Sequence, residues 1–168
     1  RLENDDPILD AVLANLPGIA FRCLDDPQWT MLYMSGGLRD LAGYEVADVL
    51  SNARLSYGDL IHPDDRKKVS DEIRHALDMR RTYQVEYRLV RADGESVWVW
   101  EQGRGAFDER GKVRFLDGVV IDANARVTER NRAADELRAS EERFRTLVEQ
   151  APIAILVQTD GVYRYANQ

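Results

Sequence analysis

The sequence is poor in cysteine: Cys23 is the only one among 168 residues. A single cysteine cannot form an internal disulfide, and it excludes a zinc site built from several cysteines. Basic residues are also in the minority, with 23 Lys and Arg against 30 Asp and Glu, which gives a formal net charge of −7. Because nucleic-acid binding draws on clustered Lys and Arg, this balance disfavours a nucleic-acid partner.

Long hydrophobic runs are missing as well. No apolar stretch approaches the roughly 18 residues that predict a membrane span, and no signal peptide is visible. We therefore expect a cytoplasmic fragment that makes no membrane contact of its own. Its composition, 44% hydrophobic and 32% charged, is ordinary for a globular protein, and its length allows one domain with a hydrophobic core plus an appendage.

Apolar spacing in the first half of the chain predicts helices and two short strands. A longer helix is expected to begin at Pro63, with Asp64 and Asp65 in its first turn, and to bury one face as far as about Met79. The other expected elements are a helix over 7–16, strands over 19–24 and 30–34, and small helices over 38–42 and 46–50.

Three longer strands are expected next, over 83–89, 96–106 and 113–121, because apolar and polar residues alternate there. Asp93-Gly94 predicts the first hairpin turn. On the second strand, Val97 and Val99 face one side of the sheet and Trp98 and Trp100 the other, where the helix over 7–16 or a second subunit would cover the indoles. Gly103-Arg104-Gly105 predicts a strand irregularity. Together the elements describe an α+β domain with an antiparallel sheet.

Beyond Asp122 the chain becomes charged and strongly helix-forming, and a heptad-like seam runs along the expected helix. Arg130 and Glu141 interrupt this seam, and Pro152 is expected to end the helix. Residues 149–155 then repeat the pattern of residues 14–20, which predicts the opening of a second, similar domain. The seam positions are Val127, Ala134, Glu141 and Val148, interleaved with Arg130, Leu137 and Phe144.

These segments resemble the PAS family with its C-terminal PAC motif, in the variant that carries a His-Pro-Asp-Asp box. The resemblance covers nearly the whole chain and depends on the order and spacing of several short motifs. The motifs are His62-Pro63-Asp64-Asp65-Arg66, Glu86-Tyr87-Arg88-Leu89, Asp93-Gly94-Glu95, Trp98-Val99, Gly103, Asp108-Glu109-Arg110-Gly111, Gly118-Val119-Val120-Ile121-Asp122 and Ser140-Glu141-Glu142-Arg143-Phe144-Arg145.

The resemblance implies a five-stranded antiparallel sheet with helices over one face, enclosing a core that sometimes holds a small molecule. It also implies signal output through the helix after the last strand, commonly towards a histidine kinase or a cyclic-di-GMP enzyme in the same chain. The expected divisions are a flanking helix over 1–17, a PAS/PAC domain over 18–122, a helical connector over 123–151 and the truncated start of a second PAS domain over 152–168. We expect a homodimer and no catalytic activity in the chain itself.

The junction between sheet and connector departs from the family pattern Asp-Ile-Thr-Glu-Arg. If Thr128-Glu129-Arg130 aligns with that pattern, Arg126 replaces the aspartate. If Asp122 aligns, about four residues are inserted, slightly more than one helical turn. We favour Asp122 as the signal junction, because its carboxylate is able to cap the first amides of the outgoing helix.

A small-molecule pocket would lie between the inner face of the sheet and the long helix. The sequence leaves open whether the side chains there enclose a ligand or simply fill the core. The expected lining residues are Phe21, Tyr33, Ile73, Leu77, Val85, Tyr87, Val97 and Val99.

The alternative function is that of a sensor domain that binds haem or flavin. We nevertheless expect that the chain binds no cofactor. His75 would be the haem ligand, but the apolar face of its helix leaves it near the edge. Flavin photosensors of the family place a reactive cysteine after the second strand, where this chain has none, so Cys23 is interpreted as a small buried hydrophobe. His62 is interpreted as part of a tight turn that starts the long helix, not as a ligand or base.

Overall fold

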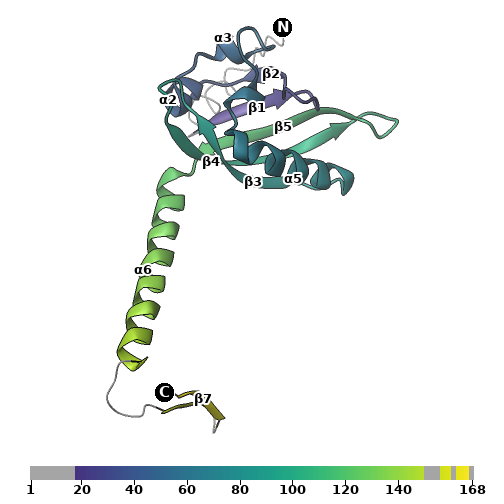
Figure 1. The fold of residues 1–168 in the computed structure, drawn as a ribbon. Coiled ribbons are helices and arrows are strands. Elements are labelled where there is room, and N and C mark those ends of the chain that lie inside the picture. Colours follow the sequence, from purple (N-terminus) through teal and green to yellow (C-terminus); the bar gives the residue numbers. More distant parts are fainter. Residues whose placement is uncertain (1–17, 150–155, 160–161, 167–168) are drawn as a thin grey trace, which may run out of the picture. The chain divides into compact units, whose positions relative to one another are not determined.

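The computed structural model describes residues 18–149, 156–159 and 162–166, and its main feature is a five-stranded antiparallel sheet (Figure 1). The strand order is β2-β1-β5-β4-β3, so the first strand lies beside the last. This confirms the α+β fold that the strand patterns predicted. The strands are β1 Ile19–Cys23, β2 Met31–Met34, β3 Tyr83–Val90, β4 Ser96–Phe107 and β5 Val113–Asp122.

The helices between β2 and β3 lie near the positions expected for them. The long helix α5 packs against β3 and buries the face that carries Val69, Ile73, Ala76 and Leu77 (Figure 1). One short helix, α4, was not expected, because four residues are too few to show a helical period. The helices are α2 Leu38–Ala42, α3 Val46–Val49, α4 Tyr57–Leu60, the 3-10 turn η1 Pro63–Asp65 and α5 Arg66–Asp78.

The core lies between the inner face of the sheet and these helices. As the alternation predicted, Val97 and Val99 of β4 are buried in it, while Trp98 and Trp100 point to the opposite face and are half-buried. On β3 the alternation likewise buries Tyr83, Val85, Tyr87 and Leu89. The helix expected over 7–16, which would cover the indoles, falls outside the described residues.

The glycines of β4 have a packing role, and the irregularity predicted at Gly103-Arg104-Gly105 is wrong. Gly103 pairs regularly with Gly118 of β5, and the register shifts only between Ala106 and Phe107. A Cβ atom built on Gly103 would lie 2.4 Å from Oη of Tyr83. Position 103 therefore carries no side chain because the ring of Tyr83 occupies that space.

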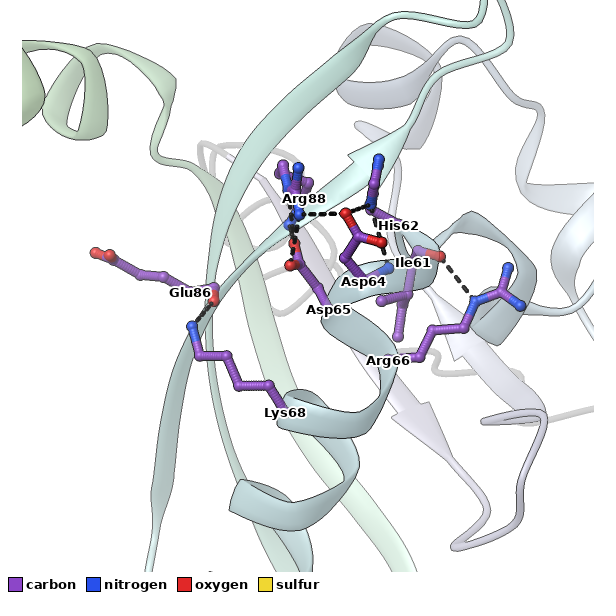
Figure 2. A network of polar contacts seen from close by, with 8 residues as sticks. All are labelled: Ile61, His62, Asp64, Asp65, Arg66, Lys68, Glu86 and Arg88. Carbon is purple, nitrogen blue, oxygen red and sulfur yellow. Dashed lines mark hydrogen bonds and ion pairs between the residues drawn. The ribbon is translucent and has the colours of Figure 1, made fainter.

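A polar network ties the start of α5 to β3 (Figure 2). Nε and Nη2 of Arg88 donate to the two carboxylate oxygens of Asp65 at 2.9 and 2.8 Å, and the backbone N–H of Arg88 donates to Asp65 as well. Nδ1 of His62 accepts from the backbone N–H of Asp64 at 3.3 Å, and Pro63 opens the turn. The interpretation of His62 as a turn residue is therefore confirmed.

The chain divides between Ala125 and Arg126 into two compact units. The helix after β5 is α6, Asn124–Glu149, and the second unit also contains a hairpin of β6, Leu156–Thr159, and β7, Val162–Ala166. This antiparallel pair lies within residues 152–168, the segment expected to open a second domain. Within the described ranges, no helix is long and apolar enough to cross a membrane.

Candidate functional site

Glu101 is a carboxylic acid in the middle of the apolar core, with only 4% of its surface exposed. Tyr83 Oη donates to its Oε1 at 2.7 Å, and Tyr87 Oη donates to its Oε2. Tyr57 of α4 extends the cluster, since its Oη lies 2.9 Å from that of Tyr87. We call these four residues the Glu101 cluster.

The register of the sheet explains why the cluster assembles. Glu101 of β4 lies directly opposite Val85 of β3, so Tyr83 and Tyr87 are its diagonal neighbours on the same face. On its other side Glu101 pairs with the buried Val120 of β5. Both tyrosines thus reach the carboxyl group from flanking positions on one strand.

Electrostatics favour the protonated form of Glu101. Burial raises the pKa of its carboxyl group above the ordinary value, against the opposing effect of the hydrogen bonds from Tyr87 and Tyr83. In the part of the chain that the structure describes, no Lys, Arg or His side chain forms an ion pair with Glu101. Burial also raises the pKa of the hydroxyl groups of Tyr57, Tyr83 and Tyr87, so they remain hydrogen-bond donors.

A cavity of about 10 Å³ lies beside the Glu101 cluster. Because one water needs roughly 10–15 Å³, the cavity as it stands has room for a water at most. Cys23 is part of the wall, and burial raises the pKa of its thiol, which keeps it protonated. The lining residues are Phe21, Cys23, Trp29, Met31, Tyr57, Ile61, Val69, Ile73, Tyr83 and Glu101.

The structure brings some of the expected lining residues together and separates others. Phe21 and Ile73 line the cavity, and Tyr87 reaches it through Glu101. Leu77 is buried, but lies under Gly105 at a different part of the sheet. Tyr33 pairs with Arg22 of β1, so it lies on the opposite face from Phe21 and does not line the cavity. Val85, Val97 and Val99 are buried on the inner face without lining it.

Glu101 itself was missed, although the sequence carried a signal for it. It follows Val97 and Val99 at a spacing of two, so the alternation that buries the valines buries the acid as well. Tyr57 and Trp29 could not be found in this way, because α4 and the β1–β2 connection are too short to show alternating or helical spacing of apolar residues.

The exit from the sheet is held by two hydrogen bonds. The backbone N–H of Ala123 donates to the carbonyl oxygen of Trp98 on β4. The N–H of Asn124, the first residue of α6, donates to Oδ1 of Asp122 at 2.7 Å. The contact expected between Asp122 and the first amides of the outgoing helix is therefore present.

His75, the residue considered for haem ligation, is exposed on α5 and does not line the cavity. Its imidazole does not face the Glu101 cluster, so this position does not fit an axial ligand in the core. Among the described residues, no group of three or more His, Cys, Asp or Glu side chains is placed to hold a metal ion.

Known proteins match both the fold and the sequence. A sequence model of the PAS fold matches residues 31–120, and a PAS domain model matches residues 142–168. A methyl sulfide methyltransferase-associated sensor from Methanosarcina acetivorans is 32% identical over 74% of this chain, and a two-component sensor, PprA, from Pseudomonas aeruginosa is 30% identical over 72%. The crystal structure of a sensory box histidine kinase/response regulator from Burkholderia thailandensis is 26% identical, with a TM-score of 0.61 over 83% of this chain and 98% of that one.

A sheet of this order, with helices over one face, defines an α+β fold. The chain belongs to the PAS family and contains one PAS domain followed by the start of another. It spans 12% and 13% of the length of the two curated sensors.

Proposed function

We propose that this chain is a signal-relay module of a larger signalling protein, with a histidine kinase or a cyclic-di-GMP enzyme as the output domain. The module itself is regulatory and not catalytic. Burial and a raised pKa keep Cys23 from acting as a nucleophile, while His75 is exposed on a helix whose other face covers the core. The sensor names of the two curated relatives support this assignment.

The observation that carries the proposal is that one strand links the core to the exit. β4 contains both Glu101, inside the core, and Trp98, whose carbonyl oxygen accepts the hydrogen bond from Ala123 just before α6. β5 pairs with β4 along its length and ends at Asp122. A change around Glu101 that moves β4 therefore changes the anchoring of the first turn of α6.

The connector helix is proposed to act as a two-state element in a dimer. Leu137 and Phe144, seven residues apart on α6, have 63% and 61% of their surface exposed. A second copy of the helix would cover them along the heptad-like seam. The polar Arg130 and Glu141 weaken that seam, so a small free-energy bias from the sheet domain is enough to switch it.

The proposal is tested by stiffening the seam in the full-length protein. Substituting both Arg130→Leu and Glu141→Leu should lock output in one state, because a continuous apolar seam removes the alternative packing. The readout is signal-dependent activity of the output domain. A charge-matched control, Arg132→Leu with Glu136→Leu, changes an exposed pair off the seam and should leave the response intact. An unchanged response in the seam variant contradicts the proposal.

The pocket residues are proposed as the input side of the relay. Phe21, Ile73, Val85, Tyr87, Val97 and Val99 are candidate contacts or supporting side chains of a small ligand. Tyr33 and Leu77 are less well placed, because they lie away from the cavity.

A further inference from the structure

Burying the Glu101 cluster lowers the stability of the fold, and the packing of the core does not require an acid at this position. A buried acid loses its hydration, and a leucine or valine at this position would continue the alternation of β4. Glu101 is also the one carboxyl group in the wall of the inner cavity, and the rest of that wall is mostly aromatic and aliphatic. A carboxyl group among aromatic rings has the chemistry of a cation-binding site.

A second cavity adjoins the first from outside. This outer cleft has a volume of about 400 Å³ and is open to solvent. Its walls come from the β1–β2 connection, from Gly58 of α4 and from residues 66–74 of α5, and it carries charges of both signs. Its lining residues are Asp25, Asp26, Pro27, Trp29, Gly58, Ile61, Arg66, Lys67, Ser70 and Arg74.

Trp29 and Ile61 line both the inner cavity and the outer cleft, so they form a wall between the two. Ile61 is fully buried, whereas Trp29 is half-buried. Trp29 also has a φ of 52°, a left-handed conformation that is unfavourable for a bulky residue. The backbone on both sides of Trp29 is held by hydrogen bonds: Gly58 N–H donates to the Gln28 carbonyl oxygen at 3.0 Å, and Leu24 N–H donates to the Thr30 carbonyl oxygen at 2.9 Å. Opening of the wall therefore requires a rotation of the indole side chain and not a displacement of the whole connection.

We propose that the inner cavity is the closed form of a binding site for a small organic cation, an ammonium group on an aromatic or aliphatic body, which enters from the outer cleft when Trp29 swings away. The ammonium group pairs with the Glu101 carboxylate, and Tyr83 and Tyr87 remain hydrogen-bonded to that carboxylate. The body of the ligand takes the space that the indole leaves, against Phe21 and Ile73. This inference rests on the proposed function, because it names the ligand class of the relay's input site.

Binding is coupled to loss of a proton. In the closed form burial raises the pKa of Glu101 and so favours its protonated form, against the opposing hydrogen bonds from Tyr87 and Tyr83. A cation favours the carboxylate, so the proton passes from Glu101 to solvent as the ligand binds. The titratable groups that face Glu101 are Tyr83 and Tyr87 of β3, Tyr57 of α4 and Cys23 of β1, and the pKa of each is raised. Helix α5 and strand β5 face it with apolar side chains only: Val69, Ile73 and Val120.

Three matched probes test the ligand class by calorimetry on the 168-residue chain: 2-phenylethylammonium, the neutral 2-phenylethanol and the anionic phenylacetate. We expect the cation to bind most tightly. Its affinity should rise with pH by up to about tenfold per unit while Glu101 of the free protein is protonated. Buffers of different ionisation heat should report one released proton. Equal binding of all three probes, or binding without proton release, overturns the inference.

Two variants locate the site. Glu101→Gln keeps the shape of the side chain and should weaken cation binding at least about tenfold while abolishing proton release. Trp29→Leu should speed association several-fold, because the wall no longer has to open.

The control variant is Asp25→Asn, which lies in the outer cleft only and should change neither result. If the cation still binds to Glu101→Gln but not to Asp25→Asn, it occupies the outer cleft and the inference is wrong. Far-UV circular dichroism checks that each variant is folded.

The cation site and the relay through α6 can be disproved independently of each other. If no probe binds while the Arg130→Leu, Glu141→Leu variant still locks output, the cation site is wrong and the relay stands. If the cation binds as expected but that seam variant responds normally, the site stands and the relay through α6 is wrong.

Discussion

Glu101 lowers the stability of the domain at neutral pH, because it must either lose its charge or keep an unpaired charge in an apolar core. The two tyrosine hydrogen bonds offset part of this cost but supply no positive charge. Proteins keep such groups where binding or switching needs them, at the expense of folding free energy. At the scale of the residue, then, the cluster is better explained by function than by packing.

Because of this cost, the free energy of unfolding should depend on pH in a predictable direction. In the unfolded chain Glu101 loses its proton near its ordinary pKa of about 4.3, whereas in the folded chain the pKa is raised. Between these two pKa values the unfolded state binds fewer protons, so the free energy of unfolding falls with rising pH by at most about 1.4 kcal/mol per unit. Glu101→Gln should remove this fall. Urea unfolding at several pH values measures it.

The exposed Glu109→Gln is the matched control for that experiment. It removes one carboxyl group from the β4–β5 turn and should leave the pH profile of the wild type unchanged. Parallel profiles for Glu101→Gln and the wild type would show that Glu101 is ionised in the folded protein.

At the scale of elements, the pair of Asp65 and Arg88 fastens the start of α5 to β3 (Figure 2). The side chains are only 13% and 28% exposed, so solvent screens them less than a surface pair. Hydrogen bonds from Arg88 lower the pKa of Asp65 below its ordinary range. This contribution to stability is present above the unfolded-state pKa of about 3.9 and is lost as the pH falls through the lowered value.

Asp65→Asn should therefore cost about 1–3 kcal/mol of unfolding free energy at neutral pH. The difference from the wild type should shrink in acid, as Asp65 of the wild type becomes protonated. Asp71→Asn provides the control, since it breaks an exposed pair with Lys67 and should change stability little. Equal effects of the two substitutions would show that the Asp65 pair is an ordinary surface contact. Chemical denaturation at neutral and acid pH measures both.

The sequence predicts the elements that have a regular period, but not the contacts between residues far apart in the chain. β3, β4 and α5 were found because period-two or helical spacing runs through them, and Asp93-Gly94 marked the turn between the two strands. The contact between Asp65 and Arg88 was not predicted, because the two residues lie 23 positions apart and only the folded chain brings them together. Tyr33 was misplaced for a related reason: a four-residue strand shows too little alternation to fix which side faces the core.

For the molecule as a whole, the proposed relay should depend on the angular phase of α6, which is 26 residues long. Inserting one residue between Arg132 and Ala133 rotates everything after it by about 100° relative to Asp122. Inserting a whole heptad at the same point changes that phase by only about 20°. Leu137 and Phe144 then keep their orientation relative to the first turn of α6, so these exposed side chains can still pair with a second helix.

We therefore expect the one-residue insertion to abolish or invert the signal response of the full-length protein, and the seven-residue insertion to preserve it. Output activity with and without the signal is the measurement. Since the seven-residue insertion lengthens the helix more, length alone predicts the reverse order of effects. If both insertions leave the response unchanged, the helix transmits no rotational information, and the coupling of β4 to Ala123 serves only to hold the end of the sheet.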